Sequence, residues 1–268
     1  MTAAADPSRR PARPRPSLVV PAGIVAFLVI TWVSQSDQFG IGLDIGALAE
    51  SITRGAGILG ELLSPNWEFI PNTLEPLRET IQMAVLASAI GCAVALPIAF
   101  VVSRVTAPNL PTLWIGRSLL SVVRAIPDIL YALVFVASVG VGPLAGIAAL
   151  VFFNIGVVAK LLSETVDGVD TGPIEAARAA GANRTQTVRW SVLPQVLPNY
   201  VAYSLYTFEL NIRASTVIGI VGAGGMGNLL FTQYRFFNWS NVSVIVIELF
   251  LLVMTIEFVS IWLRRRLV

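Results

Sequence analysis

Long runs of residues without charge are the feature that most limits what this chain can fold into. A bilayer-spanning helix needs about 20 consecutive, mostly apolar residues. Six runs reach about that length with no more than two charged side chains each: 16–36, 80–103, 118–139, 144–162, 196–221 and 243–263. Only 13% of the chain is charged, against about 25% in an ordinary soluble domain. We therefore expect an all-α, polytopic membrane protein with about six transmembrane helices.

The few charges indicate how these helices are oriented. Short loops rich in Lys and Arg stay in the cytoplasm. Arginines precede the first run at positions 9, 10, 13 and 15, and Arg264, Arg265 and Arg266 follow the last. The segment 37–79 carries seven acidic residues and only Arg54 and Arg78 as basic ones. The pattern predicts a multi-pass protein of a bacterial cytoplasmic (inner) membrane with both termini in the cytoplasm.

Four parts follow from this pattern. Residues 1–16 are rich in arginine and proline, as in a disordered cytoplasmic tail. Residues 17–36 form the first transmembrane helix; because no small-x-small cleavage site closely follows, a retained helix is favoured over a signal peptide. Residues 37–79 form an external segment, read as an interfacial helix or as a lid. Residues 80–268 form the transmembrane core, including a cytoplasmic loop over 163–194.

Composition excludes several chemistries. There is no histidine and only one cysteine, Cys92, so histidine-based catalysis and His or Cys metal sites are excluded. The one lysine, Lys160, lies between Ala159 and Leu161, so no Walker A motif exists. Gly222, Gly224 and Gly227 match the dinucleotide fingerprint in spacing, but they follow an apolar helix and no βαβ unit surrounds them. We expect no catalytic residue, no metal and no cofactor bound by this chain.

The loop 163–194 predicts a compact helical knob. Pro173 suits a first helical turn and Glu175 faces the helix dipole favourably. A run of alanines makes the helix thin, and Gly181 allows a sharp turn after it. A second helix is expected from Arg184 to Leu193, ended by Pro194. Such a knob is suited to docking in a cleft of another protein.

The same residues resemble a known family. Glu175-Ala-Ala, Gly181 and Leu193-Pro194 reproduce the EAA signature of bacterial ABC importer permeases, although Ser191 stands where an aliphatic residue is common. The resemblance implies a type I ABC importer permease fold whose loop forms coupling helices against a separate ATPase. It assigns this coupling to Glu175, Ala176, Ala177, Arg178, Gly181, Leu193 and Pro194.

Further motifs resemble the phosphonate-type permeases over about 77–266. They are Arg124-Ala-Ile-Pro-Asp128, Glu209 to Gly219, and Val221 to Gly227. The last also occurs in methionine-type permeases. Glycines at the outer end of a span suit a tight turn or close helix approach, and in transport terms an external gate. The gate residues are Gly222, Gly224, Gly225 and Gly227.

Ionisable residues inside spans are costly and are candidates for function. Glu209 and Arg213 lie one helical turn apart and share a face. Either they neutralise each other structurally, or Arg213 lines a pathway for an oxyanion and Glu209 orients it. Arg124 and Asp128 repeat this spacing around Pro127, where a structural ion pair at a kink is favoured. The candidate pathway residues are Arg213, Glu209, Asn211, Ser215, Thr216 and Arg124.

These observations predict the transmembrane subunit of an ABC importer for phosphonate, phosphate or phosphite. It would work as a homodimer with two ATPase subunits, which bind ATP and Mg²⁺, and with an extracytoplasmic substrate-binding protein. It would not be an enzyme and would not bind nucleic acid. Three alternatives remain open: a methionine-like or other small-solute ABC permease, an ion-coupled secondary transporter, and a membrane scaffold that transports nothing.

Overall fold

The computed structural model describes residues 19–34 and 55–267, and these residues are almost entirely helical, with no strand among them. They belong to two compact units, Met1–Leu59 and Gly60–Val268. In the first unit, α1 (Val19–Ser34) is the part of the first expected span that is described. The expected tail 1–16 and residues 37–54 of the external segment lie outside the described residues.

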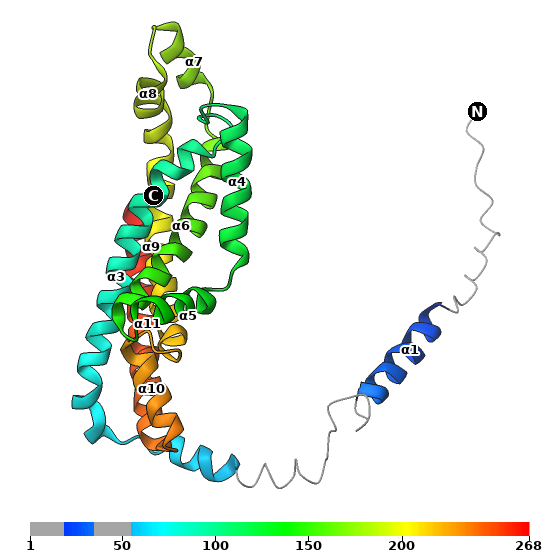
Figure 1. The fold of residues 1–268 in the computed structure, drawn as a ribbon, viewed down its shortest axis with the longest axis vertical. Coiled ribbons are helices and arrows are strands. Elements are labelled where there is room, and N and C mark those ends of the chain that lie inside the picture. The colour runs from blue at the N-terminus through cyan, green and yellow to red at the C-terminus, as the bar shows by residue number, and fades with distance from the viewer. Residues whose placement is uncertain (1–18, 35–54, 268) are drawn as a thin grey trace, which may run out of the picture. The chain divides into compact units, whose positions relative to one another are not determined.

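The second unit is a bundle of helices that ends in a helical knob (Figure 1). A 3-10 turn, η1 (Trp67–Phe69), leads into the bundle. The bundle helices are α3 (Ile70–Val101), α4 (Leu110–Ala125), α5 (Asp128–Val139), α6 (Pro143–Asp167), α9 (Leu193–Gly219), α10 (Gly225–Arg235) and α11 (Trp239–Leu267). The knob consists of α7 (Gly172–Ala179), α8 (Arg184–Thr187) and the π turn η2 (Val188–Val192).

The expected span 118–139 is not one helix. It consists of the end of α4 and all of α5, which meet at a bend of 86°. Ile126 between them is extended, with φ −86° and ψ 121°, as the residue before a proline prefers. Pro127 also lacks the N–H that a continuous helix needs. The kink expected at this proline is therefore a full break.

The helix that contains the second expected span begins earlier than the sequence indicated. α3 begins at Ile70, ten residues before the charge-free run, so the end of the expected external segment 37–79 is part of this helix. Residues 55–62 are helical as well. The compact core therefore starts near Gly60 and not at residue 80.

Three helices of the described residues are long and apolar enough to cross a membrane: Trp67–Val101, Pro143–Asp167 and Trp239–Arg266. The bent pair α4 and α5 makes a fourth if it is one span. Six spans are not confirmed. The helix α9 packs against α3, α6, α10 and α11, so neighbouring helices shelter polar side chains that lipid would penalise.

Small residues let α3 and α6 pack closely. Gly91 of α3 lies so near Asn154 of α6 that a Cβ at Gly91 would be 2.5 Å from the Asn154 Cβ. Ala87 and Ala149 are fully buried in the same core, together with Leu150. Small side chains at helix contacts are typical of membrane bundles, where close packing replaces the hydrophobic effect as the driving force.

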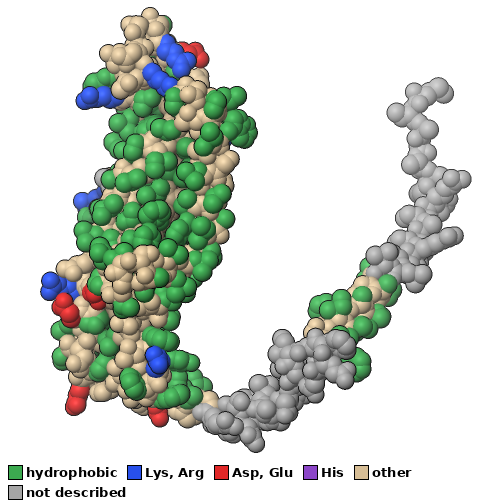
Figure 2. Space-filling model, in the orientation of Figure 1, with side chains coloured by type: hydrophobic (Ala, Val, Ile, Leu, Met, Phe, Trp, Pro, Cys, Tyr) green, Lys and Arg blue, Asp and Glu red, His purple; other side chains and the backbone are tan. Residues whose placement is uncertain are grey.

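The surface of the second unit matches a protein that lies in lipid. Figure 2 shows hydrophobic side chains over the middle of the bundle and charged ones gathered towards its two ends. Large apolar side chains such as Trp114, Leu119 and Phe250 are more than half exposed. Such a continuous exposed apolar band is abnormal for a soluble monomer.

Candidate functional site: an intramembrane charge cluster and a coupling knob

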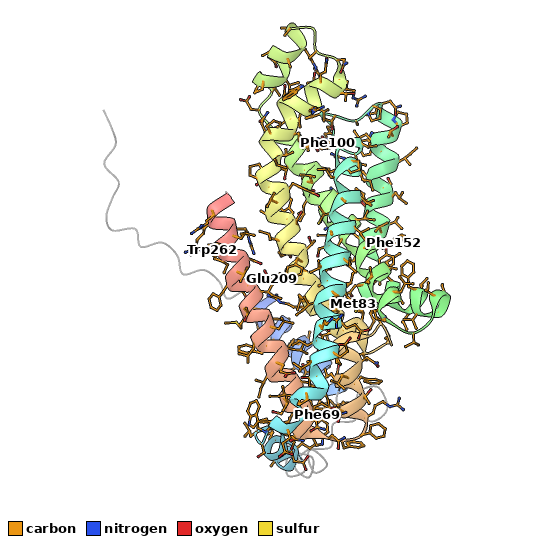
Figure 3. The ribbon with its side chains drawn as sticks, turned by 90° about the vertical axis from the view of Figure 1, so that its left-hand side faces the viewer. Phe69, Met83, Phe100, Phe152, Glu209 and Trp262 are labelled. Atoms are coloured by element: carbon orange, nitrogen blue, oxygen red, sulfur yellow. The ribbon has the colours of Figure 1, made fainter. Side chains whose placement is uncertain are left out.

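The expected pair of Glu209 and Arg213 is present and belongs to a larger cluster. Arg213 Nη2 donates directly to Glu209 Oε1 within α9. Two residues of α11 join them: Glu257 Oε2 lies 3.7 Å from Arg213 Nη2, and Arg264 Nη2 lies 3.4 Å from Glu209 Oε2. Figure 3 shows Glu209 beside α11. We call these four residues the charge cluster; it holds two positive and two negative side chains.

Sequence reasoning did not connect Glu257 or Arg264 with this pair. Both lie on a different helix, and only the packing of α11 against α9 brings them close. A weak signal was present: Glu257 and Arg264 are seven positions apart, which is two helical turns, so both lie on one face of the helix.

Two of the candidate pathway residues point elsewhere. Asn211 is fully buried and its Nδ2 donates to Ser88 Oγ of α3 at 2.7 Å. Ser215 is buried as well and donates to the Ile212 carbonyl of its own helix. Thr216, half-buried, also faces the Ile212 carbonyl, at 3.4 Å. Asn211 therefore bonds α9 to α3, Ser215 bonds only within α9, and neither is exposed beside Arg213.

Arg124 is exposed at the end of α4, and no ion pair with Asp128 is found among the described residues. The break at Pro127 puts the two residues on separate helices, so the helical spacing expected for them does not exist. Asp128 instead lies in the first turn of α5, where the helix dipole favours a carboxylate.

The segment with the glycines expected to form an external gate is hydrogen-bonded to α3 at Glu79 and Thr80. Gly225 N donates to Glu79 Oε2 at 2.7 Å, and Met226 N donates to Thr80 Oγ1 at 2.8 Å. Gly222 and Gly224 have φ of +92° and +85°, which only glycine adopts freely. The N-terminus of α10 thus receives a carboxylate from α3, as helix N-termini favour.

Glu79 was not a candidate from the sequence. It is the last charged residue before the run 80–103, which marks it as lying at the membrane boundary but does not reveal its partner. The partner is set by the turn at Gly222–Gly225, whose backbone also connects to the α5–α6 turn through Gly142 N and the Gly222 carbonyl at 2.9 Å.

The coupling loop forms the expected knob. Helix α7 has Pro173 in its first turn and ends in a Schellman motif, in which Gly181 N donates to the Arg178 carbonyl and Ala182 N to the Ala177 carbonyl. Gly181 has φ +82°, as this motif requires. Glu175, Ala176 and Arg178 are exposed on α7, and Ala177 is half-buried.

The second part of the knob differs from the prediction. Pro194 does not end a helix that starts at Arg184; α8, η2 and α9 follow one another without a gap. A π turn over Val188–Val192 precedes the proline, and its wider geometry accommodates a residue that has no N–H and whose ring crowds the preceding turn. Leu193 is half-buried and Pro194 exposed at this junction.

Ser191, where the family resemblance departs, has a clear contact. It is buried, and its Oγ donates to the Pro173 carbonyl at 3.0 Å. The hydroxyl therefore ties the start of α7 to the π turn, a contact that an aliphatic side chain cannot make.

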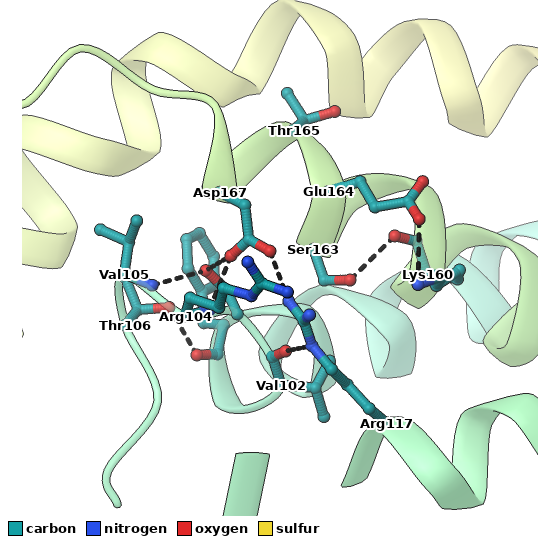
Figure 4. A network of polar contacts seen from close by, with 12 residues as sticks. Val102, Arg104, Val105, Thr106, Arg117, Lys160, Ser163, Glu164, Thr165 and Asp167 are labelled. Atoms are coloured by element: carbon teal, nitrogen blue, oxygen red, sulfur yellow. Dashed lines mark hydrogen bonds and ion pairs between the residues drawn. The ribbon is translucent and has the colours of Figure 1, made fainter. Parts of the chain in front are cut away.

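A polar network joins the end of α6 to the α3–α4 loop and to α4, close to the knob (Figure 4). Asp167, at the end of α6, accepts hydrogen bonds from Ser103 Oγ at 2.7 Å and Arg104 N at 2.6 Å, and it pairs with Arg117 of α4. Arg184 of the knob donates to the Thr106 carbonyl in the same α3–α4 loop. The knob is therefore bound to the α3–α4 loop through Arg184, and that loop is bound in turn to the end of α6 through Asp167.

Comparison with known proteins agrees with this fold. The family model described as "Binding-protein-dependent transport system inner membrane component" matches residues 95–268. A solved inward-facing methionine ABC transporter, MetNI, contains a chain with a TM-score of 0.68 and 24% identity, which covers 76% of this chain and 99% of that one. The fold is that of a type I ABC importer permease.

Two curated relatives are more similar in sequence. The phosphate-import permease protein PhnE of Mycolicibacterium smegmatis is 40% identical over 83% of this chain, which spans only 42% of that protein's length. The phosphite transport system permease protein PtxC of Stutzerimonas stutzeri is 36% identical over 83% of this chain and 81% of its own. The chain belongs to the family of binding-protein-dependent transport system inner membrane components.

Proposed function

We propose that this chain is the membrane-spanning subunit of an ABC importer for phosphonate, phosphate or phosphite. The observation that carries the proposal is a permease fold with two separate candidate functional regions. A small-residue knob projects at one end, and a half-exposed arginine lies inside the bundle. A planar guanidinium matches the paired oxygens of a phosphorus oxyanion. The named substrates of the two curated relatives support this class.

The knob would be the contact with the ATPase. It carries the EAA residues on an exposed, thin helix, and this chain has no Walker A lysine of its own. One knob per chain and two ATPase sites per transporter imply a homodimer with two ATPase subunits. An extracytoplasmic binding protein would deliver the substrate. The chain itself breaks no bond; ATP and Mg²⁺ belong to the partner.

The knob side would face the cytoplasm. Arg178, Arg184 and Arg189 lie in or beside the knob and Arg264–Arg266 end α11, whereas Glu61, Glu68 and Glu75 lie near the opposite end of the bundle. This distribution follows the positive-inside rule and puts the C-terminus in the cytoplasm.

In transport, closure of the ATPase dimer would bring the two knobs together. Because Arg184 joins the knob to the α3–α4 loop and Asp167 joins that loop to α6, this motion would tilt the bundle helices as connected bodies. The substrate would pass the charge cluster near Arg213. At the other end, the turn at Gly222–Gly225, fastened to Glu79, would act as the gate.

The proposal is tested by the ATPase activity of the reconstituted complex with its ATPase and binding-protein partners. Methylphosphonate, phosphate, phosphite and methionine are compared as stimulants. We expect at least one of the three phosphorus oxyanions to stimulate hydrolysis severalfold and methionine to have no effect. Stimulation by methionine alone would instead assign the chain to the methionine-like permeases, in which Arg213 is structural.

A further inference from the structure

Two carboxylates, Glu209 and Glu257, face Arg213. The Arg213 side chain is 49% exposed, although it lies within a bundle helix, so the side chain is accessible to an incoming group. Glu209 on one side of it is only 12% exposed, whereas Glu257 on the other is 44% exposed. The two carboxylates are thus held in different ways.

Glu209 is a fixed partner. One of its oxygens accepts from Arg213 one turn along the same helix, and the other lies 3.4 Å from Arg264 of α11. Both oxygens are therefore engaged by guanidinium groups. Removal of this carboxylate would leave Arg264 without its carboxylate partner and Arg213 with only the longer contact to Glu257, which is unfavourable.

Glu257 is a loose partner. Among the interactions of the described residues, its one contact is with Arg213 Nη2, at 3.7 Å, which is too long for a hydrogen bond. Its half-exposed side chain has room to turn away. Of the two carboxylates, Glu257 is the one that can leave at small cost.

The charge balance makes such an exchange necessary. The charge cluster contains two guanidinium groups and two carboxylates, so it is neutral. A phosphorus oxyanion that joined all four groups would add uncompensated negative charge where the effective dielectric constant is low. If Glu257 withdraws, the oxyanion takes its place and the local balance around Arg213 is kept.

We propose that Glu257 is an exchangeable counter-ion: it covers Arg213 when no substrate is present, and the phosphorus oxyanion displaces it. This inference rests on the proposed function. Arg213 then has a negative partner in the membrane both with and without substrate. Because Glu257 competes with the substrate for Arg213, the substrate binds weakly enough to be released on the other side of the membrane. The selected ligands are anions that offer two oxygens to one guanidinium.

The test is equilibrium binding of radiolabelled methylphosphonate to the permease–ATPase complex in lipid nanodiscs, without the binding protein. We expect Glu257→Gln, which keeps the shape and removes the charge, to lower the Kd by about tenfold. Glu75→Gln is the matched control, because Glu75 makes an exposed ion pair of similar length, 3.6 Å, with Arg78; its Kd should equal that of the wild type. Arg213→Gln added to Glu257→Gln should abolish the gain.

An unchanged or higher Kd for Glu257→Gln would overturn the inference. Should this variant fail to assemble, Glu257→Asp carries the same test, since the shorter side chain draws the carboxylate away from Arg213; a lower Kd supports the exchange, and an unchanged or higher one overturns it. The proposed function is contradicted by a different result: no phosphorus oxyanion stimulates the ATPase activity of the wild-type complex.

Discussion

Gly227→Ala is expected to prevent the second unit from reaching a stable fold. A Cβ at this position would lie 2.8 Å from the Thr216 carbonyl carbon and 3.0 Å from the Gly219 Cα, and closer still to the Thr216 carbonyl oxygen. These are backbone atoms of α9, which no change of rotamer can move away. We expect a loss of about 3 kcal/mol or more, measured as a lower unfolding temperature of the purified protein in detergent.

Gly60→Ala is the control for this prediction. Gly60 is in a helical segment, and a Cβ there would have no atom within 4 Å, so alanine should be neutral or slightly stabilising. Equal unfolding temperatures for Gly227→Ala and the wild type would mean that α9 and α10 do not cross as closely as described.

Ala176→Trp is expected to disconnect transport from ATP hydrolysis while the permease still folds. Ala176 is exposed on α7, so an indole there displaces nothing within this chain. The indole would, however, prevent the knob from entering the cleft of the ATPase. We expect substrate uptake to fall by more than about tenfold, and the affinity for the ATPase to fall by at least about tenfold, which is about 1.4 kcal/mol of docking free energy. The measurement is uptake by proteoliposomes, with capture of the ATPase on the immobilised permease as a second readout.

Ala176→Ser is the matched control, since it adds one oxygen at the same position and should leave uptake and capture unchanged. Full uptake by the Ala176→Trp variant would exclude coupling through the knob. It would favour the ion-coupled secondary transporter, for which the charge cluster would be the coupling site.

Local features of the fold could be read from the sequence. The charge-free runs located the long helices, because lipid tolerates charges poorly, and the Pro173, Glu175 and Gly181 positions indicated the start and end of α7. Each of these depends on residues near one another in the chain. The observed helix ends differ from the expected ones where a helix extends beyond the apolar run, as α3 does at Ile70.

Other features could not be read in this way, either because a local pattern allowed two outcomes or because the contact is between distant residues. The 86° break at Pro127 separated Arg124 from Asp128, although their spacing indicated a pair. The π turn before Pro194 kept a helix continuous where a proline suggested an end. Likewise, Glu79, Asp167 and Glu257 acquire their partners only when α3, α6 and α11 pack, so residue type alone did not single them out.

Uptake by proteoliposomes that hold the permease and its ATPase, with the binding protein outside, tests the central claim most directly. Labelled methylphosphonate, phosphate and phosphite are offered in turn, with either ATP or ADP on the ATPase side and no ion gradient. The account predicts accumulation of at least one of the three with ATP and none with ADP. Accumulation of none of the three with ATP, or equal accumulation with ADP, would contradict it.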